Sequence, residues 1–106
     1  PMNIKVKLYT QRIEQDALGQ MVEAPEHWRD LWCEPTYSGG SLKTFAGRLA
    51  SEHQVVLTTH WRRNIDKCRY VNHDGDIHPI DDVVMELRNG MQPLAHIITS
   101  TTRYGE

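Results

Sequence analysis

Residues 83–99, VVMELRNGMQPLAHIIT, decide the fold of this 106-residue chain. Apolar and polar side chains alternate through much of this stretch, as they do in a strand with one buried face. Asn89-Gly90 is the dipeptide that most strongly favours a tight hairpin turn, and the return strand begins at about Leu94. The stretch therefore predicts two antiparallel strands joined by a short loop.

The same two-residue period recurs along most of the chain. The predicted strands cover residues 4–12, 27–37, 53–62, 67–72, about 77–88 and 94–99. Asp74-Gly75 supplies a second hairpin turn, and Pro25 is expected to close the connection between the first two strands. A chain of this length has room for one domain, residues 1–106. Together these features predict a mainly β domain, a small antiparallel six-stranded β-barrel or rolled sheet.

One segment has a helical period instead. In residues 41–50 the apolar side chains recur at i, i+3, i+4, i+7 and i+8, which is one stripe of an amphipathic helix. The stripe consists of Leu42, Phe45, Ala46, Leu49 and Ala50. Ser41 can cap the helix, and Gly39-Gly40 makes its entry flexible. We predict one short α-helix here, in the long loop between the second and third strands.

Two interpretations of this apolar stripe remain open. The stripe covers an open side of the chain's own barrel, or it docks on an adjacent copy or another partner. A long loop carrying its own element is unusual in so small a barrel, and such insertions are typically functional.

Composition limits the classes of function. Fourteen acidic residues against twelve Lys and Arg give a net charge of -2, which disfavours a protein that holds DNA by its phosphates. Hydrophobic residues make up 39% of the chain, which predicts a thin core and stabilisation by neighbouring subunits. No apolar run approaches the roughly 18 residues of a membrane span, and we expect a soluble protein that is not exported.

The segment Trp61-Arg62-Arg63 is the best candidate for contact with nucleic acid. Adjacent aromatic and basic residues can stack on a base and hold a phosphate, as in barrels that bind single strands. Alternatively, Trp61 enters the core at a strand end while the two arginines meet water or the carboxylates of a neighbour. The net charge of the chain favours this second interpretation.

Candidates for chemistry are weak. His73, Asp74, Asp76 and His78 lie close enough in sequence to suggest a metal site, but they surround a predicted turn where Asp and Gly serve the backbone. Cys33 and Cys68 are expected to be reduced thiols in strands. Recognisable nucleophile, phosphate-loop and metalloprotease motifs are lacking. We therefore predict no enzymatic activity, no metal and no cofactor.

The order of several dispersed residues matches a known family. The matching positions are Asp16-x-x-Gly19, Trp28-x-x-x-Trp32, Pro35, Ser38-Gly39, His60-Trp61-Arg62, Ile65, Arg69, Asp74-Gly75 and Ile80-x-x-Val83. Over residues 4–99 the chain resembles the phage head-tail joining proteins, also called head-closure, stopper or head-tail adaptor proteins. The third strand of that family typically ends in Arg-Tyr-Arg, where this chain has His60-Trp61-Arg62.

The resemblance implies a structural virion protein of a tailed phage or prophage. Such a subunit would be assembled in the host cytoplasm into a ring, expected to be a dodecamer, at the head-tail interface. The implied partners are further copies of the chain, the portal or adaptor protein above and the tail or tail-terminator protein below. DNA would pass through the ring without sequence-specific binding, and no membrane is involved. A tail-completion or tail-terminator subunit is the related alternative, and a single-strand nucleic-acid-binding module is the more distant one.

Two sets of site residues follow from this interpretation. Gly39, Gly40, Leu42, Phe45 and Leu49 are the candidates for a loop that contacts the partner or the channel. Trp61, Arg62 and Arg63 are the candidates for the ring interface.

Overall fold

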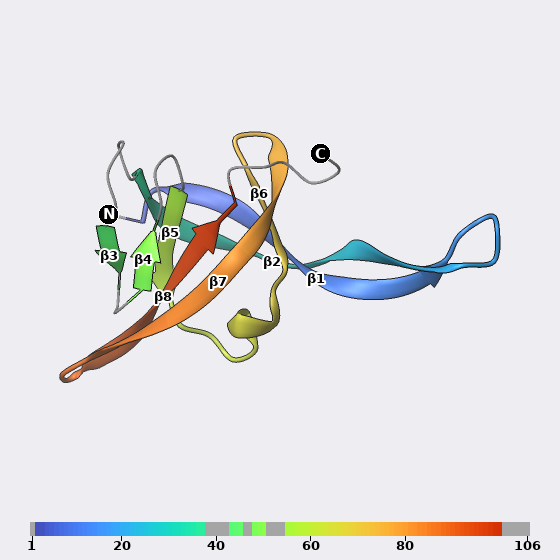
Figure 1. Cartoon of the computed structure of the whole chain (residues 1–106). Coiled ribbons are helices and arrows are strands. Elements are labelled where there is room, and N and C mark those ends of the chain that lie inside the picture. The colour runs from blue at the N-terminus through green and yellow to red at the C-terminus, as the bar shows by residue number, and fades with distance from the viewer. Residues whose placement is uncertain (1, 38–42, 46–47, 51–54, 101–106) are drawn as a thin grey trace.

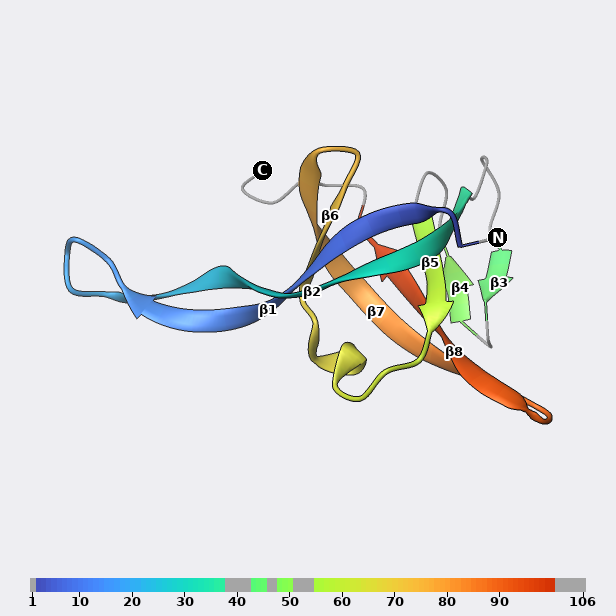
Figure 2. The ribbon, with the colours of Figure 1, turned by 180° about the vertical axis from the view of Figure 1, so that it is seen from behind.

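The computed structural model describes residues 2–37, 43–45, 48–50 and 55–100. Six strands close into an antiparallel barrel in the order β1-β2-β5-β8-β7-β6 (Figures 1 and 2). They are β1 (Ile4–Gln15), β2 (Met21–Tyr37), β5 (Val55–His60), β6 (Tyr70–His73), β7 (Asp76–Arg88) and β8 (Met91–Thr99). The predicted six-stranded antiparallel barrel is therefore confirmed. Within the described residues, no helix has the length and apolar character needed to cross a membrane.

The core lies inside the barrel because alternate residues of each strand point inward. Leu57 joins the main interior cluster, whereas its neighbour Val56 packs with Ile98 in a second cluster. The main cluster consists of Val6, Leu8, Leu31, Cys33, Leu57, Ile65, Cys68, Val71, Ala95 and Ile97. Adjacent residues of β5 therefore face opposite sides of the sheet, as expected for a two-residue period.

Both short hairpin turns have the predicted location. Asp74 and Gly75 have φ values of 57° and 84° and join the paired residues His73 and Asp76. This positive φ at both positions is the geometry that Asp-Gly accommodates at low cost. Gly90, with φ 73°, turns the chain between β7 and β8.

The predicted α-helix over residues 41–50 is wrong for the residues that the structure describes. β3 (Lys43–Phe45) and β4 (Arg48–Ala50) are short strands that pair antiparallel in a sheet separate from the barrel (Figure 1). A ten-residue helix is too short to persist by itself, and Gly47 lowers its stability by about 1 kcal/mol relative to Ala. The helical spacing of the apolar residues was not enough to outweigh these costs.

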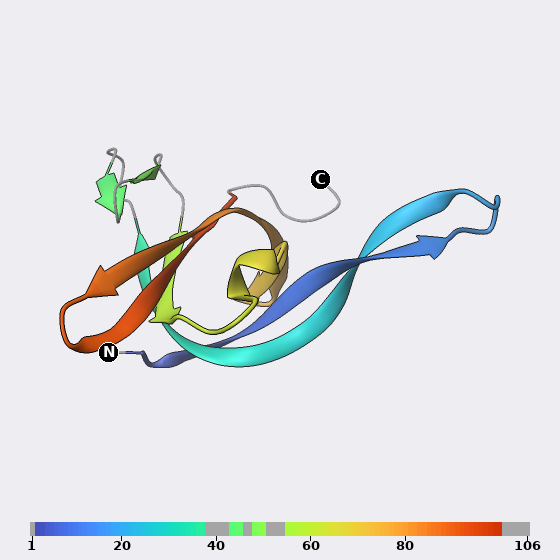
Figure 3. The same ribbon diagram turned by 90° about the horizontal axis from the view of Figure 1, so that it is seen from below.

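A single turn of 3-10 helix, η1 (Ile65–Lys67), closes one end of the barrel (Figure 3). Ile65 and Cys68 are buried in the main core cluster, so this turn acts as an apolar plug. The strand predicted from residue 67 therefore begins later, at Tyr70. Cys68 follows the 3-10 turn and is not in a strand, whereas Cys33 lies in β2 as predicted.

β1 and β2 are longer than the sequence predicted. The pair continues beyond the barrel as a two-stranded hairpin, residues 10–27, which we call the arm (Figures 1 and 3). The prediction that Pro25 closes the connection between the first two strands is wrong, because Pro25 pairs with Gln11 within the arm. Proline is tolerated there because an isolated hairpin leaves one edge of each strand without a neighbour.

Candidate interaction surfaces

Three of the seven exposed large apolar side chains among the described residues lie on the arm. Ile13 and Met21 are 65% and 67% exposed, and Leu18 at the tip is 84% exposed. The register pairs Ile13 with Glu23 and Gln15 with Met21, which places Ile13 and Met21 on the same face of the hairpin. An apolar face on a projecting hairpin is typical of a surface that contacts another protein.

The turn at the arm tip is ordered by one aspartate. Asp16 Oδ1 accepts hydrogen bonds from the backbone N–H groups of Leu18 and Gln20, both at 2.9 Å. The N–H of Gly19 donates to the carbonyl of Asp16 at 3.0 Å, and Gly19 has φ 82°. These contacts give the Asp16-x-x-Gly19 pattern a structural role: the aspartate caps the turn and the glycine supplies its positive φ.

The base of the arm is tied to the barrel. A register shift between Leu8 and Tyr9 marks the point where the hairpin leaves the barrel. There the rings of Tyr9 and His27 pack edge to face, with their centroids 5.8 Å apart. His27 Nε2 lies 2.7 Å from Asp30 Oδ1, and this hydrogen bond lowers the pKa of Asp30 below its usual value of 3.8. These contacts give the projecting hairpin an ordered base.

A basic connection crosses the end of the barrel that η1 closes. Residues 61–69 carry four Lys and Arg side chains and one carboxylate, that of Asp66. Trp61 is half-buried against the main core cluster, whereas Arg62 and Arg63 are exposed. Trp61 therefore meets the prediction that it enters the core while the arginines remain outside.

The β7–β8 hairpin continues the surface next to Trp61. The Trp61 N–H donates to the Pro93 carbonyl at 2.8 Å, and Gln92 Nε2 donates to the Trp61 carbonyl at 3.2 Å. Leu87 and Met91 near the hairpin tip are 77% and 61% exposed. We call residues 61–69 together with Leu87 and Met91 the basic end of the molecule.

The structure separates the two predicted sets of site residues. Gly39, Gly40 and Leu42 lie outside the described residues, while Phe45 and Leu49 belong to β3 and β4. This small sheet lies outside the closed barrel, whereas Trp61, Arg62 and Arg63 lie on the connection from β5 to η1 (Figure 1).

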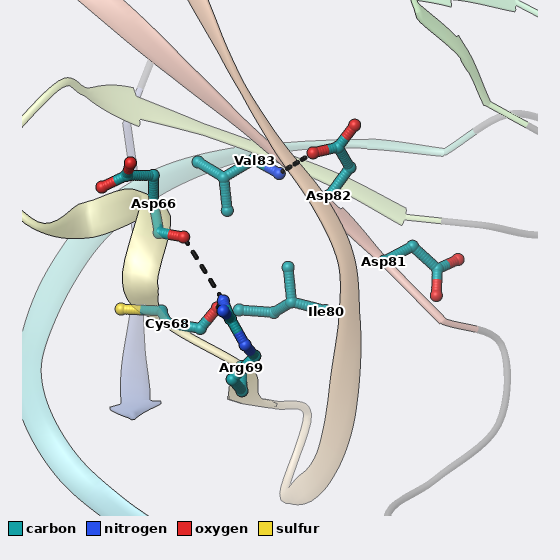
Figure 4. Close-up of a pocket in the computed structure, with 7 residues that line it drawn as sticks. All are labelled: Asp66, Cys68, Arg69, Ile80, Asp81, Asp82 and Val83. Atoms are coloured by element: carbon teal, nitrogen blue, oxygen red, sulfur yellow. Dashed lines mark hydrogen bonds between the residues drawn. The ribbon is translucent and has the colours of Figure 1, made fainter. Parts of the chain in front are cut away.

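A cleft of about 190 Å³ lies between this connection and β7 (Figure 4). Its lining residues are Asp66, Cys68, Arg69, Ile80, Asp81, Asp82 and Val83. Arg69 Nη1 donates to the backbone carbonyls of Asp66 and Cys68, at 3.4 and 3.3 Å, and Asp82 Oδ1 accepts the N–H of Val83 at 2.9 Å. The three carboxylates point in different directions (Figure 4). The cleft is smaller than a typical ligand pocket, and two of its polar side chains, those of Arg69 and Asp82, hydrogen-bond the backbone.

The other candidates for chemistry have structural roles. Cys33 and Cys68 are buried free thiols, and burial raises their pKa values to about 11 and about 12. Such thiols are poor nucleophiles at neutral pH. Asp74 belongs to the tight hairpin turn. Among the described residues, no group of three or more His, Cys, Asp or Glu side chains is placed to hold a metal ion.

Sequence reasoning missed the arm. Its signal was present, because Ile13, Met21 and Val22 continue the apolar content of the two strands on both sides of the Asp16 turn. The interruption of strict alternation at Arg12 and the presence of Pro25 concealed that continuation. Sequence analysis therefore did not relate the arm to the basic end.

These features define a class: a small closed β-barrel from which hairpins project. The family model for phage head completion proteins matches residues 1–99, and the chain belongs to that family. It is a structural protein of phage virions. The predicted relationship to virion proteins of the head-tail region is thereby confirmed.

Comparison with solved structures supports the fold. A chain from the virion of a native gene transfer agent particle is similar, with a TM-score of 0.57 and 16% sequence identity. The match covers 92% of this chain and 91% of that chain. Comparison with curated protein sequences gave no match.

Proposed function

We propose that this protein is a head-tail connector subunit that forms a ring beneath the portal, closes the DNA-filled head and offers a docking surface to the tail. Membership of the head completion family over residues 1–99 carries this proposal. We propose a structural role without catalysis. The chain's net charge of -2 suits a ring that surrounds DNA without binding its phosphates tightly.

The shape of the subunit supports assembly into a ring. A cyclic ring needs two different patches on each subunit, one for each neighbour. The arm and the β7–β8 hairpin project in opposite directions from a molecule with extents of 50 × 31 × 23 Å (Figure 1). We expect twelve copies in the ring, with the portal or adaptor protein above and the tail or tail-terminator protein below.

The two predicted site regions have separate roles in this proposal. Residues 37–53, including Gly39, Gly40, Leu42, Phe45 and Leu49, contact the portal, the channel or the adjacent subunit. Trp61, Arg62 and Arg63 lie at the ring interface, and the exposure of Arg62 and Arg63 on the β5–η1 connection supports that role.

Removal of the protein from a producing phage tests the proposed function. We expect heads that lose DNA or lack tails, and electron microscopy of complete particles should locate the protein in a ring between portal and tail. Normal tailed particles without the protein would contradict the proposal. Deletion of residues 39–50 tests the loop separately, and full-titre particles from that variant would remove it from the mechanism.

A further inference from the structure

The arm and the basic end have opposite charge and comparable apolar content. Along the arm, residues 10–27, one arginine stands against four carboxylates, those of Glu14, Asp16, Glu23 and Glu26. Residues 61–69 have the reverse balance, four cations against one carboxylate. Opposite patches of this kind attract one another and fix the orientation of docking.

Each surface also carries apolar side chains that the isolated subunit leaves in water. The arm has Ile13, Leu18 and Met21, and the basic end has Leu87 and Met91. Burial of such side chains supplies the non-directional part of binding, at about 25 cal/mol per Å² of apolar surface. The two surfaces therefore match in both kinds of interaction.

The projecting part of the arm lies away from the basic end of its own subunit. The arm extends away from the barrel on the side opposite the β7–β8 hairpin, as Figures 1 to 3 all show. Within one subunit the basic end contacts the base of the arm, where the Tyr9 carbonyl accepts the Arg69 N–H at 2.9 Å. The arm residues that project beyond this point can reach the basic end of another copy and not their own.

We propose that the arm of one subunit docks on the basic end of the next copy and that this head-to-tail contact builds the ring. The inference rests on the proposed function for its place in the virion. It assigns Arg62 and Arg63 a specific partner, the carboxylates of the neighbour's arm: Glu23, on the face that carries Ile13 and Met21, and Glu26, on the opposite face. Leu18 and Met21 pack near Leu87 and Met91 of that neighbour. Because the contact joins two different surfaces, it repeats around a ring and closes when the rotation per subunit permits.

Reciprocal charge reversal tests this pairing. One variant carries Glu23→Arg with Glu26→Arg, a second carries Arg62→Glu with Arg63→Glu, and a third combines all four. Self-association of the purified chain is measured by sedimentation over a range of concentrations, and tailed particles are counted after complementation. We expect each one-sided reversal to weaken self-association about tenfold or more and to reduce tailed particles, and the combined variant to recover much of both.

Lys5→Glu with Lys7→Glu is the matched control, because it reverses two exposed charges on the barrel part of β1. We expect this control to assemble like the unaltered chain. Rising salt should weaken the unaltered assembly, since the paired charges are at the surface.

Three outcomes would overturn the inference. The first is normal assembly by both one-sided variants, and the second is a combined variant no better than either of them. The third is a chain that is monomeric at every concentration and whose reversals leave the particles unchanged. If Arg62→Glu with Arg63→Glu abolished oligonucleotide binding but not self-association, the basic end would be a nucleic-acid surface instead.

The proposed function is judged separately. Normal tailed particles in the absence of the protein would contradict the connector role, while self-association of the purified variants would still decide whether the arm binds the basic end.

Discussion

β1 and β2 each have two halves that differ in the burial of their apolar side chains. In the barrel half, Val6, Leu8 and Leu31 are buried, whereas in the arm half Ile13 and Met21 are largely exposed. Both halves use the same antiparallel pairing. The difference is that β5 and β6 flank only the barrel half, which lets the sheet close around a core. Apolar residues in the same pair of strands therefore stabilise the subunit in one half and are available to a partner in the other.

The largest effect on stability is expected in the barrel half. Leu8→Ala removes a fully buried side chain from the main cluster and should lower the free energy of unfolding by about 2–5 kcal/mol. Leu18→Ala, at the exposed arm tip, is the control and should change it by less than about 0.5 kcal/mol. Chemical denaturation measures both. Equal losses would show that the exposed Leu18 contributes as much to the stability of the subunit as the buried Leu8.

A smaller effect is expected from one hydrogen bond. Thr59 is buried, and its Oγ1 donates to the Trp32 carbonyl at 2.8 Å. Thr59→Val should lower the free energy of unfolding by about 1 kcal/mol, because it leaves that carbonyl without this donor. Thr10→Val removes the matching bond on the arm, from Thr10 Oγ1 to the Glu26 carbonyl at 3.4 Å, where water can replace it. The control should be close to neutral by the same denaturation assay.

The buried thiols predict loss of stability at alkaline pH. Burial raises the pKa values of Cys33 and Cys68 to about 11 and about 12 from their usual 9.0, so the folded state disfavours the thiolates. Their contribution to stability is complete below pH 9 and is lost as pH rises through the folded values. Denaturation midpoints measured from pH 8 to 11 should fall. The fall should be shallower in a variant with Cys33→Ala and Cys68→Ala, and an equal fall would contradict the role of the thiols.

The smallest effect on stability is expected from shortening the arm. Replacing residues 11–25 by Asn-Gly would join the paired residues Thr10 and Glu26 through a two-residue turn. The barrel should retain its circular dichroism spectrum and unfold within about 1 kcal/mol of the full chain, because the removed residues contribute little to the core. Self-association should be lost. A shortened chain that assembles normally would show that the arm does not join neighbouring subunits.

The sequence predicted the parts of the fold that local patterns encode. The two-residue period separated Leu57 from Val56, and the structure places these two residues in different core clusters. The turns at Asp74-Gly75 and Asn89-Gly90 could be placed because their backbone geometry depends on the turn residues themselves. The head-tail relationship also rested on residues readable in order along the chain.

Patterns that depend on context were less informative. The helical spacing in residues 41–50 predicted a helix where β3 and β4 form, because periodicity alone does not include the cost of a short helix or the availability of a pairing strand. The basic residues Arg62 and Arg63 were found as a candidate surface, but their proposed partner on the arm lies far away in sequence. The opposite charges of the arm and the basic end can be recognised as two surfaces only when the tertiary structure shows where each lies.

The sequence by itself determined that strands would form, which side chains each strand would turn to the same face, and where the tight turns would fall, since these follow from neighbouring residues. Only the tertiary structure decided where the barrel closes and where β1 and β2 leave it. Closure depends on pairing between distant segments, such as Lys7 with Asn72 and Val56 with Ile98. Beyond Tyr9, the last residue of β1 that pairs with β6, β1 and β2 pair only with each other among the described residues. The long-range contacts therefore divide one hairpin into a buried wall of the barrel and an exposed arm.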